Sequence, residues 1–123
     1  MESILIVDDD VNLCQALNEE LCEVGYETEF VHDGDQALAN LSTKTFDLIL
    51  LDLKMPGKDG FDVLKEMNEK KIGSKVIVLT AYADVKSAID SAKMGASDFI
   101  SKPYDFDELL ITIRKVLHHR NRV

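Results

Sequence analysis

Acidic side chains follow two strongly apolar runs of this sequence, at the point where each run ends. The run Ile4–Val7 is followed by the aspartates Asp8–Asp10, and the run Leu48–Leu51 is followed by Asp52. Carboxylates within a few ångströms of one another repel, so such a cluster is costly unless a cation lies among them. If the two runs are neighbouring strands, the acids predict a site for a metal-assisted reaction on a phosphate.

The composition places the chain among soluble globular proteins and limits its possible functions. Its 123 residues suit one domain, and 46% of them are hydrophobic and 30% charged. A net charge of −9, from 14 basic and 23 acidic residues, argues against direct nucleic acid contact by this domain. No apolar stretch approaches the roughly 18 residues of a membrane span, and no signal peptide is visible. We therefore expect a cytoplasmic protein without membrane contact.

Short apolar runs and segments of helical periodicity alternate from one end of the chain to the other. The runs expected to form strands are Ile4–Val7, Glu27–Val31, Leu48–Leu51, Val76–Leu79 and Phe99–Ser101. The helical segments carry apolar stripes at Cys14, Leu17, Leu21 and Val24; at Leu64 and Met67; at Val85, Ala88, Ile89 and Ala92; and at Leu109, Leu110, Ile113, Val116 and Leu117. The alternation predicts an α/β fold, a flavodoxin-like (βα)5 doubly wound parallel sheet with strand order 2-1-3-4-5. In that order the first and third strands are neighbours, and ligands bind at their carboxyl ends.

Several residues mark the expected ends of the helices. Gly25, Gly73 and Gly95 each follow a helical segment and are expected to end it in the left-handed conformation. Asp105 with Glu108 resembles a capping box that opens the final helix. These signals set the borders of the predicted helices.

Other polar residues have structural interpretations. Asp10 is expected to cap the first helix, although it could be a further acid at the site. Asp33-Gly34 and Met55–Gly60 mark turns or loops. Cys14 and Cys22 are expected to be reduced and mostly buried thiols of one helix.

The histidines and the basic residues near the end of the sequence give no sign of a second site. No spacing typical of metal ligands connects His32, His118 and His119 with other residues. The basic residues expected to complement a helix end and begin a solvated linker are Arg114, Lys115, His118, His119, Arg120 and Arg122.

Polar residues also follow the fourth and fifth predicted strands. Thr80 follows the fourth strand, and Lys102-Pro103 follows the fifth. Together with Asp8, Asp9 and Asp52, they resemble the active site of the receiver domains of bacterial two-component response regulators. The matching segments, which run in this order across nearly the whole chain, are Ile6–Asp10, Leu51–Gly60, Thr80-Ala81, Gly95-Ala96 and Lys102-Pro103.

The resemblance implies that Asp52 is the phosphoacceptor, whose carboxylate attacks the phosphohistidine of a sensor histidine kinase. It implies a Mg²⁺ cofactor held by Asp9, Asp52 and the backbone carbonyl of Lys54, with Asp8 acting mainly through a bound water. Lys102 would pair with the phosphoryl oxygens from the other side. Such a domain catalyses only its own phosphorylation and dephosphorylation, and is not an enzyme with a separate substrate.

The resemblance also implies a conformational switch. Thr80 would donate its hydroxyl to the phosphoryl group, and the aromatic side chain of Phe99 would fill the space that Thr80 leaves. Family members often have tyrosine at this position, so an output contact through a phenolic hydroxyl is lost here. A cis Lys102-Pro103 bond would position the amine. The bulk of Lys54 and Tyr82 would slow the loss of phosphate.

The domain organisation follows from the same resemblance. Residues 1–120 would form the receiver, and residues 121–123 would begin a linker or end the chain, which is either a stand-alone receiver or a fragment of a longer regulator. Its motifs are most similar to receivers of sigma-54-dependent enhancer-binding transcription activators, with the winged-helix class second. The fourth helix, fifth strand and fifth helix would contact an output domain or a second copy in a phosphorylation-dependent homodimer, and any DNA binding would belong to another domain.

Three other functions remain as alternatives. A phosphatase of the haloacid dehalogenase kind would use the D-x-D pattern in Asp8–Asp10, but this leaves Asp52 and its loop without a role. A flavodoxin-like mononucleotide binder would need a glycine- or hydroxyl-rich loop after the first strand, where acids stand instead. A receiver used only for protein binding would lack one of the site residues, and none is missing.

Overall fold

The computed structural model describes residues 1–81 and 84–118, and in these residues five β-strands alternate with five α-helices. The strands are β1 Ser3–Val7, β2 Glu27–Val31, β3 Leu48–Leu51, β4 Lys75–Thr80 and β5 Asp98–Ser101. The helices are α1 Val11–Glu23, α2 Gly34–Thr43, α3 Gly60–Glu69, α4 Val85–Lys93 and α5 Phe106–Leu117. All strand pairings are parallel, and the strand order is β2-β1-β3-β4-β5, as the sequence predicted.

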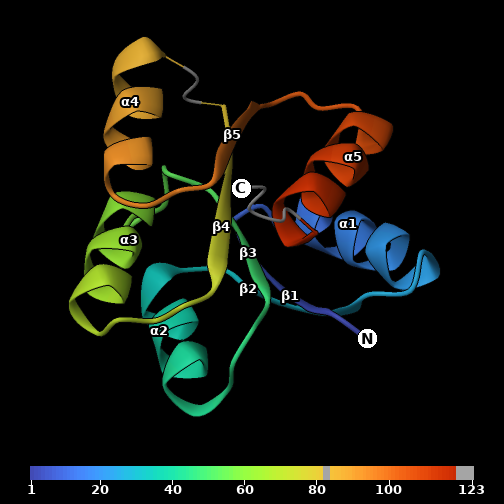
Figure 1. Cartoon of the computed structure of the whole chain (residues 1–123), viewed down its shortest axis with the longest axis horizontal. Helices are drawn as coiled ribbons and strands as arrows, with labels where there is room; N and C mark the ends of the chain where they lie inside the picture. The colour runs from blue at the N-terminus through green and yellow to red at the C-terminus, as the bar shows by residue number, and fades with distance from the viewer. Residues whose placement is uncertain (82–83, 119–123) are drawn as a thin grey trace, which may run out of the picture.

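The molecule has three layers (Figure 1). The sheet is seen nearly edge-on, with α1 and α5 on one face and α2, α3 and α4 on the other. This arrangement is the doubly wound α/β fold that the alternation of runs and helical segments predicted.

The three central strands supply both hydrophobic cores. Along β1, Leu5 and Val7 join the core under α2 and α3, whereas Ile4 and Ile6 join the core under α1 and α5. The same alternation continues in β3 and β4, because successive side chains of a strand point to opposite faces of the sheet. A strand covered on both faces needs apolar residues at every position, which explains the continuous apolar runs.

An aspartate stands at the N-cap of each described helix. The five N-cap residues are Asp10, Asp33, Asp59, Asp84 and Asp105. Each carboxylate accepts a hydrogen bond from a backbone N–H of the first turn that would otherwise lack an acceptor, which stabilises the helix start. The predicted cap at Asp10 is thereby confirmed.

Two predictions about helix starts are corrected. Asp33-Gly34 is not only a turn, because Asp33 is the N-cap of α2 and Gly34 is its first residue. The predicted capping box of Asp105 is wrong, because its carboxylate accepts from the Asp107 N–H instead of the third helical residue. The complete capping box lies at α3, where Asp59 and Asp62 exchange hydrogen bonds.

The helix ends agree with two of the three glycine predictions. Gly25 and Gly95 have φ values of 104° and 100°, which favour glycine at a helix end. Gly73 lies outside the left-handed region, and Lys71 with a φ of 56° turns the chain after α3 instead. The glycine was two residues too late to end this helix.

Two further expectations about burial are corrected. The apolar stripe predicted for α4 faces outward, since the side chains of Val85 and Ile89 are 75% and 48% exposed. Ser91 is the buried residue of this helix. Cys14 is fully buried as expected, but Cys22 is exposed, and both thiols are free.

The two edge strands carry charge. On β2, Glu27 and Glu29 are exposed, and Glu29 forms an ion pair with Lys44 at 2.8 Å. On β5, the Asp98 carboxylate accepts a hydrogen bond from the backbone N–H of Phe99 at 2.7 Å. Charged side chains therefore stand along both borders of the sheet.

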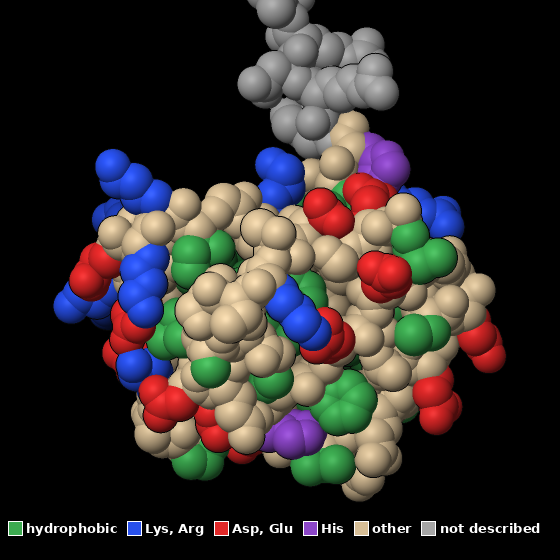
Figure 2. Space-filling view, turned by 90° about the horizontal axis from the view of Figure 1, so that it is seen from below, with side chains coloured by type: hydrophobic (Ala, Val, Ile, Leu, Met, Phe, Trp, Pro, Cys, Tyr) green, Lys and Arg blue, Asp and Glu red, His purple; other side chains and the backbone are tan. Residues whose placement is uncertain are grey.

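Acidic and basic side chains are interspersed on the face seen in Figure 2, and hydrophobic side chains lie between them. This face offers nucleic acid no uniformly basic surface. In the described part of the chain, no helix has the length and apolar character that crossing a membrane requires. The expectations for Tyr82, His119, Arg120 and Arg122 concern positions outside the described residues.

Candidate phosphoacceptor and metal site

The ends of β1 and β3 bring Asp8 and Asp52 together. The register pairs Val7 with Leu51, and the Asp52 N–H donates to the Val7 carbonyl at 2.9 Å. On the other side of β1, the Asp8 N–H donates to the Val31 carbonyl at 3.2 Å. These backbone hydrogen bonds continue the parallel pairing by one residue and place both aspartates at the carboxyl edge of the sheet.

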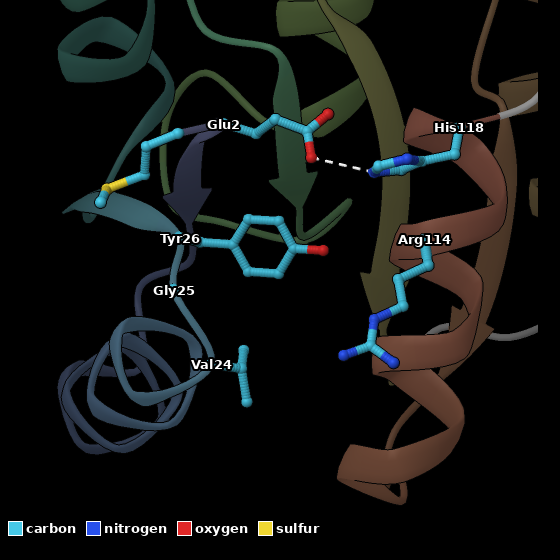
Figure 3. Close-up of a pocket in the computed structure, with 7 residues that line it drawn as sticks. Glu2, Val24, Gly25, Tyr26, Arg114 and His118 are labelled. Carbon is cyan, nitrogen blue, oxygen red and sulfur yellow. Dashed lines mark hydrogen bonds and ion pairs between the residues drawn. The ribbon is translucent and has the colours of Figure 1, made fainter.

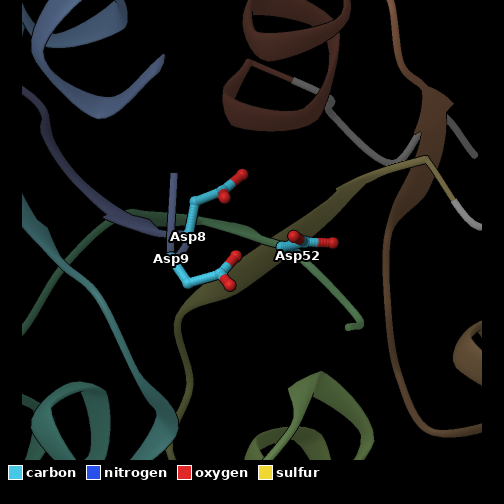
Figure 4. Close-up of side chains that lie close together, drawn as sticks. All are labelled: Asp8, Asp9 and Asp52. Carbon is cyan, nitrogen blue, oxygen red and sulfur yellow. The ribbon is translucent and has the colours of Figure 1, made fainter. Parts of the chain in front are cut away.

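Three carboxylates form a cluster at this edge (Figure 4). Asp8, Asp9 and Asp52 each offer a carboxylate oxygen, and these oxygens all lie within 4.8 Å of one another. Asp8 and Asp52 are buried, whereas Asp9 is exposed. Sparse carboxylate oxygens that are partly open to solvent fit Mg²⁺, which keeps several of its waters in protein sites.

Lys102 reaches the cluster from the end of β5. Its Nζ donates to Asp8 Oδ2 at 2.6 Å and lies 3.6 Å from Asp52 Oδ2. Its backbone N–H donates to the Thr80 carbonyl at 2.9 Å, and its bond to Pro103 is cis, as expected. The structure thus joins a cation to acids that are far away in the sequence.

Burial and charge oppose each other in this cluster. Burial raises the pKa of Asp8, and the hydrogen bonds from Lys102 and from the Asp10 N–H offset part of this effect. For Lys102, burial acts to lower the pKa, but the hydrogen bond to Asp8 and the charges of Asp8 and Asp52 outweigh it and raise the pKa. Lys102 therefore stays charged and partly neutralises the acids.

The predicted switch residues lie beside these groups. Thr80 is fully buried at the end of β4, where it pairs with Ser101. Phe99 pairs with Val78 and is half-buried against the core under α2 and α3. Thr80 and Phe99 therefore lie on the adjacent strands β4 and β5. Lys102, which follows β5, reaches the acid cluster from the same side.

Lys54 contributes a backbone group to the site. Its N–H donates to Asp52 Oδ1 at 3.3 Å, and its side chain is exposed. The start of the loop after β3 is therefore in direct contact with the candidate phosphoacceptor. The tight return of this loop requires Gly60, since a Cβ there would lie 2.7 Å from Leu53 Cα.

His32 and Cys14 support Asp8 in a way that the sequence interpretation missed. His32 Nδ1 lies 3.1 Å from the Asp8 carbonyl, and Cys14 Sγ donates to the same oxygen at 3.4 Å. His32 directly follows β2, so the strand-end rule that found the acids could also have found it. His118 instead pairs with Glu2 at 2.9 Å, beside a pocket of about 420 Å³ between α1 and α5 (Figure 3).

The sequence model of the response regulator receiver domain matches residues 4–114. The chain therefore belongs to the response regulator receiver domain family, and the resemblance inferred from its motifs is confirmed. This membership favours the receiver interpretation over the phosphatase and the mononucleotide binder.

Two proteins with similar sequences are named as regulatory proteins. The transcriptional regulatory protein ZraR of Klebsiella oxytoca is 40% identical over 116 residues, which are 94% of this chain and 26% of ZraR. The regulatory protein AtoC of Escherichia coli is 38% identical over 114 residues, which are 93% of this chain and 25% of AtoC. The chain thus spans about a quarter of the length of these relatives.

A solved structure with the same fold is that of the response regulator TrrA of Thermotoga maritima, in complex with Mg²⁺ and BeF. It is 39% identical to this chain with a TM-score of 0.85, and the match covers 95% of this chain and 100% of TrrA. Identity at this level over nearly the full length extends the likeness from the backbone fold to the sequence.

Proposed function

We propose that this receiver domain accepts a phosphoryl group on Asp52 from the phosphohistidine of a sensor histidine kinase. The observation that carries the proposal is the meeting of a buried Asp52 with Asp8, Asp9 and Lys102 at one edge of the sheet. Family membership supports it, because receivers act with histidine kinases. No separate substrate is turned over, so the domain catalyses only its own modification.

The chemistry is an in-line displacement at phosphorus. A carboxylate oxygen of Asp52 attacks the phosphorus and forms a P–O bond, while the P–N bond to the kinase imidazole breaks and its electron pair returns to nitrogen. Lys102 lies next to both Asp8 and Asp52, and its ammonium balances the negative charge of the phosphoryl oxygens. The acyl phosphate on Asp52 is the signal.

Mg²⁺ is the proposed cofactor, held by the carboxylates of Asp9 and Asp52 and the backbone carbonyl of Lys54, with Asp8 acting through a water. The donor set supports this choice, and so does the Mg²⁺ in the TrrA complex. When bound, the ion screens the carboxylates and neutralises charge on the transferring oxygens. The hydrogen bond from Lys102 holds the Asp8 carboxylate in place.

Thr80 and Phe99 are the proposed switch. The Thr80 hydroxyl donates to a phosphoryl oxygen on Asp52, and Phe99 moves into the space that the threonine side chain leaves. Burial of Thr80 supports this proposal, because a fully buried β-branched side chain has few rotamers available. Phe99 is half-buried, so part of its ring is open to solvent before such a movement.

The proposed output surface is formed by α4, β5 and α5. Its exposed apolar residues are Val85, Ile89 and Ile111. Beside α4 and β5, a hollow of about 220 Å³ is lined by residues that include Ala92 and Phe99. An exposed apolar surface of this kind favours contact with a second copy of the chain or an output domain, and phosphorylation would shift the population toward the associated form.

The proposed biological role is control of transcription in the cytoplasm by an output domain outside this chain. Two observations support this role: ZraR is named a transcriptional regulatory protein, and this chain covers only about a quarter of the length of ZraR and AtoC. Within this proposal, residues 1–120 are the receiver, residues 121–123 begin a linker or end the chain, and an output domain would be of the sigma-54-dependent activator class. DNA contact belongs to the output domain.

The experiment that tests the proposal adds Mg²⁺ and acetyl phosphate and measures the intact mass of the chain. We expect one phosphoryl adduct that is labile in base, that maps to Asp52 and that chelation of Mg²⁺ prevents. Asp52→Asn should form no adduct, whereas Asp47→Asn, at an exposed carboxylate before β3, should react normally. Modification at Asp8, or rapid hydrolysis of phosphate esters, would support the phosphatase instead.

A further inference from the structure

The loop from Leu53 to Asp59 is fixed at both ends. At its start, the Gly60 N–H donates to the Leu53 carbonyl at 3.0 Å, and the buried side chain of Met55 joins the core. At its end, Asp59 exchanges two hydrogen bonds with Asp62 in the first turn of α3. The middle of the loop, which includes Gly57 with a φ of 72°, lies outside these contacts.

Lys58 connects this middle part to two helices. Its Nζ lies 2.5 Å from Glu66 Oε1 on α3 and 3.5 Å from Asp35 Oδ1 on α2. Its backbone also lies close to the start of α2, because a Cβ on Gly34 would lie 2.5 Å from the Lys58 carbonyl oxygen. Side chain and backbone of one residue therefore hold the loop against α2 and α3.

The ion pair between Lys58 and Glu66 is more restrained than an ordinary surface pair. Both side chains are 31% exposed, and the second cation near Glu66, Lys70, lies further away at 3.5 Å and is 57% exposed. Hydrogen bonding to Glu66 raises the pKa of Lys58, and hydrogen bonding to Lys58 lowers the pKa of Glu66, so both groups are charged at neutral pH. A pair of this kind contributes little to the free energy of unfolding, but it restricts the positions of both side chains.

The same loop begins near Lys54, whose backbone carbonyl is the proposed ligand of the cation. Lys54 follows Asp52 by two residues, and its N–H contacts Asp52 Oδ1. Three residues, Met55, Pro56 and Gly57, separate Lys58 from Lys54, so a displacement of the loop at Lys58 would bear on the peptide group that follows Lys54. Contacts one step away from a metal ligand commonly change the affinity for the ion, because they set the direction of the ligand.

We propose that Lys58 is a positioning residue of the divalent cation site. Its ion pair with Glu66 would hold the loop in the conformation that lets the Lys54 carbonyl act as a ligand beside Asp9 and Asp52, and Lys58 itself would not touch the ion. The inference rests on the proposed function, since it takes the Lys54 carbonyl to be a ligand.

The sign of the effect separates positioning from simple electrostatics. Lys58→Met removes a positive charge near an acidic site, and through charge alone this substitution would strengthen the binding of a cation. Loss of positioning acts in the opposite direction. Weaker binding of Mg²⁺ by Lys58→Met would therefore come from the loop and not from the charge.

The experiment is calorimetric titration of the chain with MgCl₂, without any phosphodonor. We expect Lys58→Met to weaken Mg²⁺ binding about three- to tenfold, below the 10- to 100-fold range typical of direct supports of a metal ligand. Lys58→Arg, which keeps the pair with Glu66, should restore binding to within about twofold. Glu66→Gln combined with Lys58→Met should not weaken binding beyond Lys58→Met alone, because both changes break one contact.

Lys70→Met is the matched control, since it removes the other cation near Glu66 but leaves the loop unchanged. It should bind Mg²⁺ within about twofold of the unchanged chain. Unchanged or tighter binding by Lys58→Met, or equal weakening by Lys70→Met, would overturn the inference and leave the proposed function intact. Absence of Mg²⁺ binding by the unchanged chain would instead overturn the proposed function. Urea unfolding in EDTA confirms that each variant is folded.

Discussion

Lys102 Nζ donates a hydrogen bond to Asp8 Oδ2 at 2.6 Å, across 94 positions of the sequence. This contact joins the end of the last strand to the end of the first, and it gives the acid cluster a cation from the protein itself. A divalent ion would take over part of this role. Stability and ion binding are therefore connected through Lys102.

Lys102→Met should destabilise the chain when divalent ions are removed. The substitution leaves two buried carboxylates without their cation, so we expect the free energy of unfolding in EDTA to fall by about 1–3 kcal/mol. Mg²⁺ should stabilise this variant more than the unchanged chain, because Lys102 no longer competes for Asp8 and Asp52. Urea unfolding with EDTA and with Mg²⁺ measures both effects.

Lys86→Met provides the comparison for Lys102. Lys86 pairs with Asp90 at 2.9 Å, but its side chain is 86% exposed, so the change should leave the free energy of unfolding nearly unaltered. Equal losses for the two lysines would show that the buried cluster has no special need for a cation.

Thr80→Val should separate phosphorylation from its consequence. Valine keeps the volume of the buried side chain but cannot donate to a phosphoryl oxygen. A hydrogen bond to a charged group contributes about 1.5–3 kcal/mol, so we expect dimer formation with beryllofluoride to weaken at least about tenfold while the Asp52 adduct still forms. Light scattering follows the dimer and intact mass follows the adduct. Thr80→Ser retains the hydroxyl and should behave like the unchanged chain.

Ile89→Asp tests the proposed dimer surface. The side chain is 48% exposed on α4, so an aspartate there should leave the stability of the monomer within about 0.5 kcal/mol. In a dimer contact the new charge would be desolvated, and association with beryllofluoride should weaken by at least about tenfold. Association at the original strength would contradict a dimer contact at Ile89. Val24→Asp would then test another surface, because Val24 follows α1 and is an apolar residue that is 43% exposed.

Gly60→Ala should disturb the loop after Asp52. A Cβ on Gly60 would meet Leu53 Cα at 2.7 Å, and a contact with backbone cannot relax by moving a side chain. We expect a loss of about 2 kcal/mol or more in the free energy of unfolding. Gly73→Ala has nothing within 4 Å of the added atom and should be neutral or slightly stabilising. A neutral Gly60→Ala would mean that the loop can move away from α3.

The folded chain should lose stability in alkaline solution because the Cys14 thiol is buried. Burial, with a smaller effect of the nearby Asp8, raises its pKa from 9.0 to about 12 in the folded chain. The unfolded chain releases this proton above pH 9 and the folded chain does not, so the free energy of unfolding falls as the pH rises from about 9 to about 12. Cys14→Ala should show a shallower decline in urea unfolding between about pH 8 and pH 11, although the cavity lowers its stability throughout. Parallel slopes would contradict the assignment.

The central strands and the acids were predictable because one physical rule governs both. A parallel strand covered on two faces needs an unbroken apolar run, as in Leu48–Leu51, and its carboxyl end must return to solvent. Asp8 and Asp52 stand at those ends, so their meeting followed from the strand order. The support of Asp8 by His32 was missed only because that rule was not applied to β2.

The burial of α4 was not predictable from its periodicity. The spacing of Val85 and Ile89 says that they share one face of a helix, but it does not say that another element covers that face. The end of α3 was missed for a different reason. Gly73 matched a helix-end signal, yet the chain had already turned at Lys71, where the N–H groups of Lys71 and Ile72 donate to carbonyls of the last turn of α3.

The charged borders of the sheet decide how copies of this domain can meet. Glu27 and Glu29 on β2 would face identical carboxylates on a neighbouring molecule, and the Phe99 N–H on β5 is already taken by Asp98. Growth of the sheet from molecule to molecule is therefore disfavoured, and fibrils seeded by strand addition should not form even in concentrated solution. In the described part of the chain, self-recognition is therefore favoured through side-chain surfaces, and reversible complexes of defined size are expected instead of open-ended polymers.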